Sequence, residues 1–575
     1  MKIHRSLKPG QTIWIQLVLI LMWVTNLRQT DSYFYVYMMI SCAGMICTWE
    51  NGKVLEQPDR KQRVACGVLA ALFSLSVVLA NYAIFEPETA LMNLFGIVSS
   101  LAGGWMIGMN VLLCLLRILP VHSISGERKK PGTVFIISFA VIVCIDLVFL
   151  FLVEYPAVVT ADSMAQLGEI LSGKYGNKNP YWHTRTMEFF VKLGLTIFGN
   201  LSAGIALFTV VQILFLAGCY SYVVMTLYQK GIPGWAVALV WAVYALLPCH
   251  IAYSATIWKD ILFSGASLLL ITSFYRLLYP VQEKTRRDLL LFGLAGLGLC
   301  LWRTNGLLVY VMFFLIMLLS CRKNKKLTAL MAVILVCALV LCGPVLSMQN
   351  IEGSDYVELL SIPLQQVARV VREGVPLAPE DLALIQTVAE PEVIAQTYQN
   401  EISDPIKKLV RECAAYETIS QEAGTYLNLW VRLGIQNPGL YLKAWIDQTK
   451  GYWNGGYSYW IIARGIFEND LGLVTRQENI VGKLFHMLNR YMELMPLVHP
   501  LLSIGLHTWI LTVCGFISYR RRNRKWLLVV PSLAIVLGLM VGTPVYSEFR
   551  YGYPVILAVP LVLMLTIFDT DPQKA

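Results

Sequence analysis

Charged residues are scarce in this chain: of its 575 residues, 14% are Asp, Glu, Lys or Arg, and 57% are hydrophobic. Soluble domains carry about 25% charged residues, so this composition excludes an ordinary soluble protein. Several apolar runs, including Leu207 to Leu227 and Leu327 to Leu346, reach the roughly 20 residues that a helix needs to cross a bilayer. The net charge of +10 is not a nucleic-acid signal, because the basic residues fall in short loops between these runs. The sequence predicts a polytopic membrane protein.

Several patterns that would define a function directly are missing. The 13 cysteines give no disulfide framework, because only Cys413 lies in the large polar region and the others lie in or beside apolar runs. The seven histidines are scattered without a His-Glu-x-x-His spacing, which argues against a metal held by histidine. The chain has no internal repeat and no low-complexity tract, which excludes a repeat protein. No small-residue cleavage site follows the first apolar run, so we expect it to be a retained span rather than a signal peptide.

The apolar runs predict about 14 membrane spans, with 12 or 13 as alternatives because several runs are short. With the N-terminus placed in the cytoplasm, the short inner segments carry 26 Lys and Arg and the short outer loops carry three, namely Arg28, Arg303 and Arg550. This asymmetry is typical of a correct span count, because cytoplasmic loops are enriched in basic residues. Both termini are then expected in the cytoplasm. The expected spans are 12–26, 33–49, 64–84, 91–116, 133–153, 202–228, 235–248, 257–275, 288–302, 305–320, 327–346, 497–518, 526–544 and 552–568.

Two long segments are then expected outside the cell, 154–201 and 347–496. The second is domain-sized, and its apolar periodicity predicts mostly helices, with Pro363 near the start of one of them. The predicted organisation is therefore four N-terminal spans (1–132), a transmembrane core (133–346) with the loop 154–201, an extracytoplasmic helical domain (347–496) and C-terminal spans (497–575).

The first long loop contains the acidic residues Asp162 and Glu154, and Glu154 is a candidate substrate ligand. A carboxylate at a membrane face can accept a proton from an acceptor hydroxyl, so Asp162 is a candidate general base. The alternative is that Thr160 or Asp162 caps a helix. His183 and Arg185 follow in the same loop and are candidate substrate ligands, although the adjacent aromatic residues are also typical of an interfacial anchor.

Isolated cations also stand at the expected outer ends of spans. Lys259 and Asp260 begin the 257–275 run, where a charged pair is costly unless it faces a cavity or a partner. Arg303 occupies a tight turn between two spans, and Arg550 precedes the last span. Three cations among apolar and aromatic residues suit a lipid-linked phosphate, while the alternatives are a snorkelling lysine and arginines that only brace turns. In the helical region, Gln365 and Gln366 are candidate sugar ligands, or ordinary packing residues.

These motifs, in this order, resemble an uncharacterised family of bacterial polytopic proteins that looks like a branch of the GT-C glycosyltransferases, which include protein mannosyltransferases and lipid A aminoarabinose transferases. The resemblance covers roughly 135–560. It implies a polyprenyl-phosphate sugar donor, an outward-facing site and Asp162 as the base. The acidic loop follows about the fifth span rather than the first, and Met164 stands where an Asp-x-Asp motif would have its second acid, so a divalent metal is left in doubt. The resemblance to this family rests on the sequence motifs Tyr155-Pro156 to Asp162-Ser163, Asn179-Pro180 to His183-Thr184, Trp258-Lys259-Asp260, Arg303-Thr304-Asn305-Gly306, Pro363-Leu364-Gln365-Gln366 and Phe549-Arg550-Tyr551.

The expected function is a membrane glycosyltransferase of the hexosyltransferase class, acting on a cell-envelope glycan or lipid acceptor. A transporter or flippase of a lipid-linked glycan is the alternative, and it should carry ionisable groups midway along several spans. A polymerase or ligase of lipid-linked glycans shares the same plan and stays open.

Overall fold

A computed structural model describes residues 9–29, 34–53, 59–86, 89–119, 128, 130–176, 179–280, 285–320, 324–351, 353, 355–459, 461–496, 498–542 and 544–568. These residues form helices and no β-strand, and their pairings outside helices are isolated bridges. The expectation of an all-α fold is confirmed. Both chain ends lie outside the described residues, so the expected cytoplasmic position of the termini stays a prediction.

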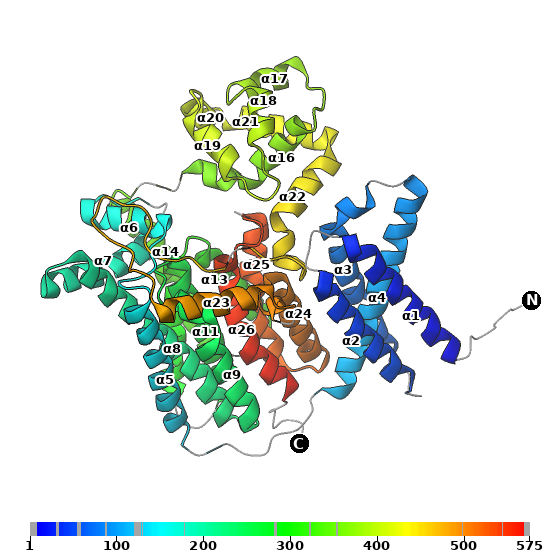
Figure 1. Cartoon of the computed structure of the whole chain (residues 1–575), viewed down its shortest axis with the longest axis horizontal. Coiled ribbons are helices and arrows are strands. Elements are labelled where there is room, and N and C mark those ends of the chain that lie inside the picture. Colours follow the sequence, from blue (N-terminus) through cyan, green and yellow to red (C-terminus); the bar gives the residue numbers. More distant parts are fainter. Residues whose placement is uncertain are drawn as a thin grey trace, which may run out of the picture.

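The first four helices form a bundle beside the rest of the chain, drawn in blue in Figure 1. Trp23 is fully buried in this bundle and packs edge-on against Tyr37 at 5.6 Å between ring centroids. A Cβ on Gly103 would lie 2.4 Å from the Leu19 carbonyl oxygen, so the first and fourth helices approach at a glycine. The helices are α1 (Pro9–Asn26), α2 (Phe34–Gly52), α3 (Arg60–Ala80) and α4 (Ala90–Ile118).

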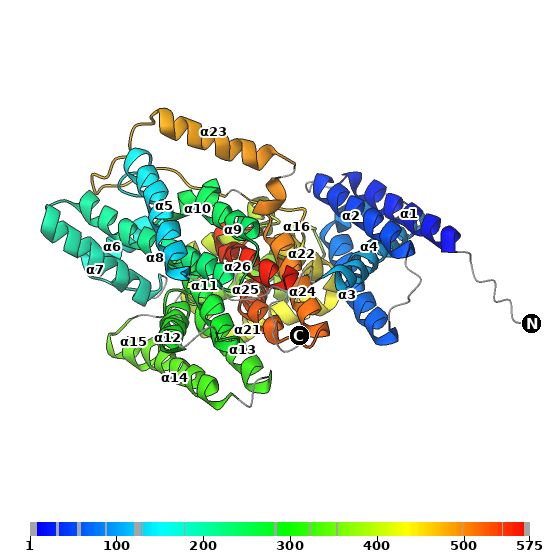
Figure 2. The same ribbon diagram turned by 90° about the horizontal axis from the view of Figure 1, so that it is seen from below.

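In the main body, α11 and α26 lie at the centre in Figures 1 and 2, and ten other described helices, counting α14 and α15, pack around them. Both central helices are largely buried, and they are apolar on nearly every face, as expected for helices surrounded by other helices. The helices of this body are α5 (Pro131–Leu152), α8 (Leu201–Gln229), α9 (Gly234–Leu246), α10 (Pro248–Ser254), α11 (Lys259–Leu278), α12 (Thr285–Leu301), α13 (Gly306–Ser320), α24 (Ile504–Arg520), α25 (Val530–Val541) and α26 (Phe549–Ile567), with α14 (Lys325–Cys342) and α15 (Pro344–Met348) on its edge.

Eight helices among the described residues are long and apolar enough to cross a membrane, or nine if α9 and α10, bent by 52°, make one span. This is consistent with a multi-pass membrane protein. Every expected apolar run is helical, but several of these helices, including α13, are shorter than a full span. The finer count of 12 to 14 spans stays a prediction.

The region 347–496 is mostly helical, as expected, and most of it stands above the main body in Figure 1. Pro363 is the third residue of α16, near its start. The helices are α16 (Ser361–Arg372), α17 (Pro379–Gln386), α18 (Pro391–Thr397), α19 (Asp404–Glu412), α20 (Tyr416–Gln421), α21 (Ala423–Gln436) and α22 (Pro438–Trp453), preceded by the 3-10 turn η3 (Tyr356–Leu360).

One part of that region departs from the helical expectation. Residues 461–479, here called the strap, are not helical and run back along the main body to α23 (Ile480–Leu494). The backbone N–H of Val159 donates to the Gly465 carbonyl at 2.9 Å, and that of Phe467 donates to the Val159 carbonyl at 2.7 Å. The strap therefore holds the segment that leads into α6 (Ala161–Ser172), where Asp162 lies.

Candidate functional site

Three helices begin at one place and bring their first-turn charged residues together. Asp162 lies in the first turn of α6, Lys259 and Asp260 in that of α11, and Arg550 in that of α26. Carboxylates are favourable there, because the positive end of the helix dipole faces them. Thr160, rather than Asp162, occupies the N-cap position of α6, which leaves the Asp162 carboxylate available for other contacts.

Hydrogen bonds between the two chain segments fix α6 against α11. The Ser163 hydroxyl donates to the Ile257 carbonyl at 2.9 Å, and the Trp258 indole N–H donates to the Thr160 hydroxyl at 2.6 Å. These bonds involve the residues that flank Asp162 and Lys259, so both charged side chains are held at the same corner.

Arg550 is the centre of the charged group. Its Nη1 lies 2.7 Å from an Asp162 carboxylate oxygen, and its Nε lies 3.2 Å from Glu548. Its guanidinium also stacks near the rings of Trp258, at 5.1 Å, and Tyr551, at 5.0 Å. The Asp162 side chain is 46% exposed and that of Arg550 is 16% exposed, so the pair opens to solvent on the Asp162 side.

Arg303 is enclosed instead. Its Nη1 lies 2.8 Å from Asp260, and both side chains are almost fully buried. Its guanidinium lies 4.4 Å from the Tyr551 ring centroid, so Tyr551 stands between the two arginines. The turn that presents Arg303 requires Gly306, since a Cβ there would lie 1.8 Å from the Leu299 carbonyl oxygen. This geometry favours a positioning role for Arg303 over direct contact with a ligand.

The charges of the cluster nearly balance. Asp162, Asp260 and Glu548 face Lys259, Arg303 and Arg550. Lys259 is partly exposed and interacts with the charges of Asp162, Asp260, Arg303 and Arg550. Burial raises the pKa of Glu548 to about 7, although the Arg550 charge opposes the shift. We call these six residues the charged cluster. The raised pKa of Glu548 means that burial disfavours the charged form of this residue within the charged cluster.

The remaining candidates of the first long loop lie apart from this group. Glu154 accepts a hydrogen bond from the Gly465 N–H at 2.9 Å and faces His486, and burial raises its pKa to about 7. Arg185 is half exposed and pairs with Glu188 on α7 (Tyr181–Phe198). Glu154 thus holds the strap, and Arg185 braces its own helix.

His183 is buried behind the cluster. Its Nδ1 lies 3.1 Å from the Gln166 amide, while its Nε2 has no hydrogen-bond partner. Burial lowers the pKa of His183 to about 3, and the Lys259 charge adds to the effect, so the ring is neutral at ordinary pH.

Gln365 and Gln366 receive packing partners within the helical region. The Gln365 amide donates to the Gln399 carbonyl at 2.6 Å, and the Gln366 amide donates to that of Tyr441 at 3.2 Å. The Trp430 indole also donates to Gln366 at 2.8 Å. The structure does not bring these amides to the charged cluster through any described contact.

Sequence reasoning did not select Glu548, Trp258 or Tyr551 as site residues. The signal was present, since each is adjacent to a selected cation or one residue removed from it. Among the described residues, no group of three or more His, Cys, Asp and Glu side chains is arranged to hold a metal ion.

A groove of about 720 Å³ runs along the main body between α8, α11 and α12 and ends at Trp302, next to Arg303. Its depth comes from the small residues Gly218, Ala266, Ala295 and Gly298. Apart from Arg287 its lining is apolar or aromatic.

The described residues form an all-helical protein with eight candidate membrane-spanning helices, consistent with a multi-pass membrane protein, and with a charged cluster where several helices begin. The chain belongs to a family of unknown function, DUF6020, whose model matches residues 172–575. The match includes Lys259, Asp260, Arg303, Glu548 and Arg550 and begins after Asp162. Neither the curated proteins nor the solved structures gave a match.

Proposed function

We propose that the protein is a membrane glycosyltransferase that moves a sugar from a polyprenyl-phosphate donor to a cell-envelope acceptor at the outer face of the membrane, in the manner of GT-C enzymes. The observation that carries this proposal is the contact between the half-exposed Asp162 and Arg550, with Lys259 beside them. A carboxylate that can take a proton and cations that can receive a phosphate are the two groups that such a transfer needs.

In the proposed reaction, an acceptor hydroxyl oxygen attacks the anomeric carbon of the donor sugar while Asp162 takes the hydroxyl proton. The bond between the anomeric carbon and the phosphate oxygen breaks, and polyprenyl phosphate leaves with the electron pair. Lys259 and Arg550 face the leaving phosphate, and Arg303 holds Asp260 and Tyr551 in place behind them. A single displacement inverts the configuration at the anomeric carbon.

The groove between α8, α11 and α12 supports a lipid-linked donor. Apart from Arg287 its lining is apolar or aromatic, two of its three helices, α8 and α11, are long and apolar enough to cross a membrane, and it ends beside Arg303. A polyprenyl chain lying in it would present its phosphate to the charged cluster without leaving the bilayer.

The helical region supports closure of the site from above. The Tyr452 hydroxyl at the end of α22 donates to the Val545 carbonyl at 2.8 Å, and a Cβ on Gly451 would lie 2.3 Å from Ser547. These contacts place α22 against the residues that lead into Glu548, so we assign acceptor choice to 347–496.

The distribution of charge favours transfer over transport. A transporter is expected to carry ionisable groups midway along several spans. The six members of the charged cluster instead stand at or near helix ends, and the buried pair of Arg276 and Asp288 lies at the opposite end of α11. Asp146 is buried well inside α5 and does not contribute to the cluster.

Mass spectrometry of cell-envelope glycans tests the proposal. A deletion strain should lose a hexose modification, the wild-type gene should restore it, and a gene encoding Asp162→Asn should not. Equal restoration by both genes would remove Asp162 as base, and an unchanged glycan profile in the deletion strain would contradict the proposed activity itself.

A further inference from the structure

The helical region contains a second apolar cavity, far along the chain from the charged cluster. It has a volume of about 420 Å³ and lies among η3, α16, α17, α18, α19, α20 and α21. This volume falls in the range typical of ligand sites. The buried residues of the region form two separate apolar clusters, one around Ile385, Ile406 and Leu429 and one around Val357, Val410 and Ile419. The cavity is lined by members of both, so it lies where a single core would otherwise close.

The lining offers a ligand almost nothing polar. Four lining residues, Tyr356, Ser420, Tyr426 and Trp430, carry polar side-chain atoms. The Tyr356 hydroxyl donates to the Tyr416 carbonyl at 2.7 Å, that of Tyr426 pairs with Thr387 at 3.0 Å, and the Trp430 indole donates to Gln366 at 2.8 Å. These three groups already have partners within the protein, and Ser420 lies at the exposed rim, so the cavity suits hydrocarbon and disfavours a sugar.

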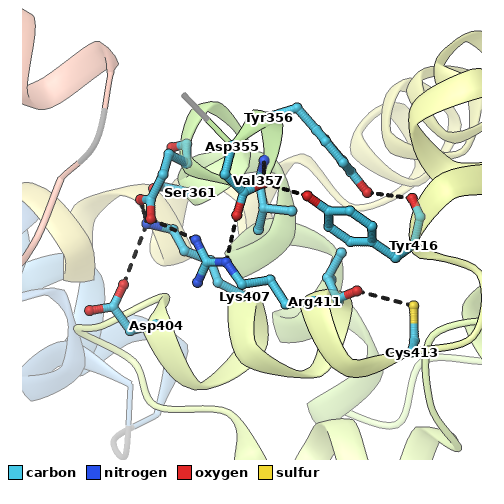
Figure 3. Close-up of polar contacts among 11 residues, drawn as sticks. Asp355, Tyr356, Val357, Ser361, Asp404, Lys407, Arg411, Cys413 and Tyr416 are labelled. Carbon is cyan, nitrogen blue, oxygen red and sulfur yellow. Dashed lines mark hydrogen bonds and ion pairs between the residues drawn. The ribbon is translucent and has the colours of Figure 1, made fainter. Parts of the chain in front are cut away.

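A network of ion pairs keeps one wall of the cavity in place (Figure 3). Arg411 on α19 contacts Asp355 and Glu358 at 2.6 Å each, and Lys407 contacts Glu358 at 2.8 Å and Asp404 at 3.4 Å. This network joins η3 to α19, and both elements also line the cavity. The network therefore holds η3 against α19 at this wall.

The same network also bears on the charge of the occupant. Three carboxylates surround two cations, so the rim near η3 carries no free positive charge for an anionic head group. This argues against polyprenyl phosphate and favours a lipid without net charge.

The bilayer is the nearest source of hydrocarbon chains. The exposed apolar surface of α14 continues to Met348 at the end of α15, which is 81% exposed, and η3 follows a short link later. Leu359 on η3 is 74% exposed and Leu427 on α21 is 56% exposed, and both line the cavity at its rim. Single exposed apolar side chains of this size are ordinary, but Met348 and Leu359 lie at the two ends of the link that joins α15 to the cavity.

We propose that this cavity binds the acyl chain of a zwitterionic membrane phospholipid. The site is independent of the glycosyltransferase proposal, because none of its residues belongs to the charged cluster or to the groove beside α11. The cavity is open at its rim, where Leu359 and Leu427 are exposed, and an acyl chain lying in it would remove this apolar surface from water.

Photo-crosslinking of the full-length protein in lipid nanodiscs tests this inference. The probe is phosphatidylcholine with a diazirine on its acyl chain, in a phosphatidylethanolamine bilayer, and the labelled peptides are mapped by mass spectrometry. Label should appear in peptides that contain η3, α16 or α21, as well as in the lipid-facing peptides of α14, which serve as an internal standard.

Two variants at the exposed rim keep the test decisive. Ala423→Trp and Ser420→Trp narrow the mouth from solvent-facing positions and should reduce label in the helical region about tenfold, as expected for loss of a well-fitting apolar site, without changing label in α14. Ala383→Trp, on the exposed side of α17 and outside the lining, is the matched control and should leave both signals unchanged.

Label in α14 without label in the helical region of the wild type would overturn the proposal. So would label that Ala423→Trp and Ser420→Trp both leave intact. A parallel experiment uses a diazirine polyprenyl phosphate, and labelling by that probe alone would replace the acyl assignment with a prenyl one. A change of oligomeric state in the rim variants, with no lipid label in the wild type, would instead assign the cavity to a second copy of the chain.

Discussion

Replacement of Arg550 by lysine keeps a positive charge but removes the planar group that contacts Asp162 and Glu548 together and stacks near two rings. An ammonium can hold one carboxylate in this geometry but cannot also present a fork to a phosphate. Losing one charge-assisted hydrogen bond costs about 1.5–3 kcal/mol, so we expect Arg550→Lys to weaken binding of a polyprenyl-phosphate analogue by about tenfold or more. The thermal stability should fall only modestly, because lysine keeps the positive charge and its partner Asp162 is 46% exposed.

Arg303→Lys should show the opposite pattern. Arg303 is buried against Asp260 and Tyr551, and removing a partner from a buried ion pair costs about 3–5 kcal/mol. Lysine retains the charge, so we expect a smaller loss of about 1–3 kcal/mol in the free energy of unfolding, with the donor affinity of the folded protein nearly intact.

The chain offers a matched control in Arg276, which is buried against Asp288 at the opposite end of α11. Arg276→Lys should lower the stability and leave donor binding unchanged. Both quantities are measurable in detergent, by thermal unfolding and by titration with the analogue. Unchanged affinity in Arg550→Lys would remove its phosphate role, and lost affinity at full stability in Arg303→Lys would show that the roles of the two arginines are reversed.

Three further predictions follow from the site and the topology. Asp162→Asn should lower transfer by about 100- to 10,000-fold in a protein that still folds, and near-normal turnover of the purified variant would exclude Asp162 as base. Burial raises the pKa of Glu548 to about 7, so its contribution to the free energy of unfolding is complete below its ordinary pKa and is lost as pH rises through about 7. Between pH 5 and 9, the thermal stability of Glu548→Gln should therefore decline less than that of the wild type. An equal decline of the two proteins would contradict this. In a cysteine-free background, a cysteine at the exposed Gln421 should react with a membrane-impermeant reagent in intact cells and one at the exposed Lys61 should not, whereas the reverse result would invert the topology.

The sequence was sufficient to predict the helices, because apolar runs and 3.6-residue periodicity are local properties. The apolar periodicity of 347–496 predicts mostly helices, and α16, α17, α19, α21 and α22 lie there. The strap was not anticipated, because its conformation depends on backbone hydrogen bonds to Val159, more than 300 residues earlier in the chain. The sequence of the strap itself has no periodic pattern from which such a contact could be predicted.

The candidate site was predictable as a set of residues and not as an arrangement. Lys259, Arg303 and Arg550 stand out because each charge interrupts apolar sequence at the end of a run. Their meeting with Asp162 depends on how α6, α11 and α26 pack, and the sequence alone does not specify that packing. Gln365 was selected as a candidate sugar ligand; its amide N–H donates to the Gln399 carbonyl at 2.6 Å, and its role in sugar binding stays a prediction.

The distance along the chain between Asp162 and Arg550 sets an order for biogenesis. The two residues are 388 positions apart, and Arg550 lies in the first turn of α26. During synthesis, Asp162 and Glu154 reach the membrane surface long before the strap and α26 exist, so the carboxylate of Asp162 waits for its guanidinium partner until nearly the whole chain has been translated. Assembly of the charged cluster is thus completed only after α26 has been synthesised, and a chain that stalls before α26 has an incomplete cluster.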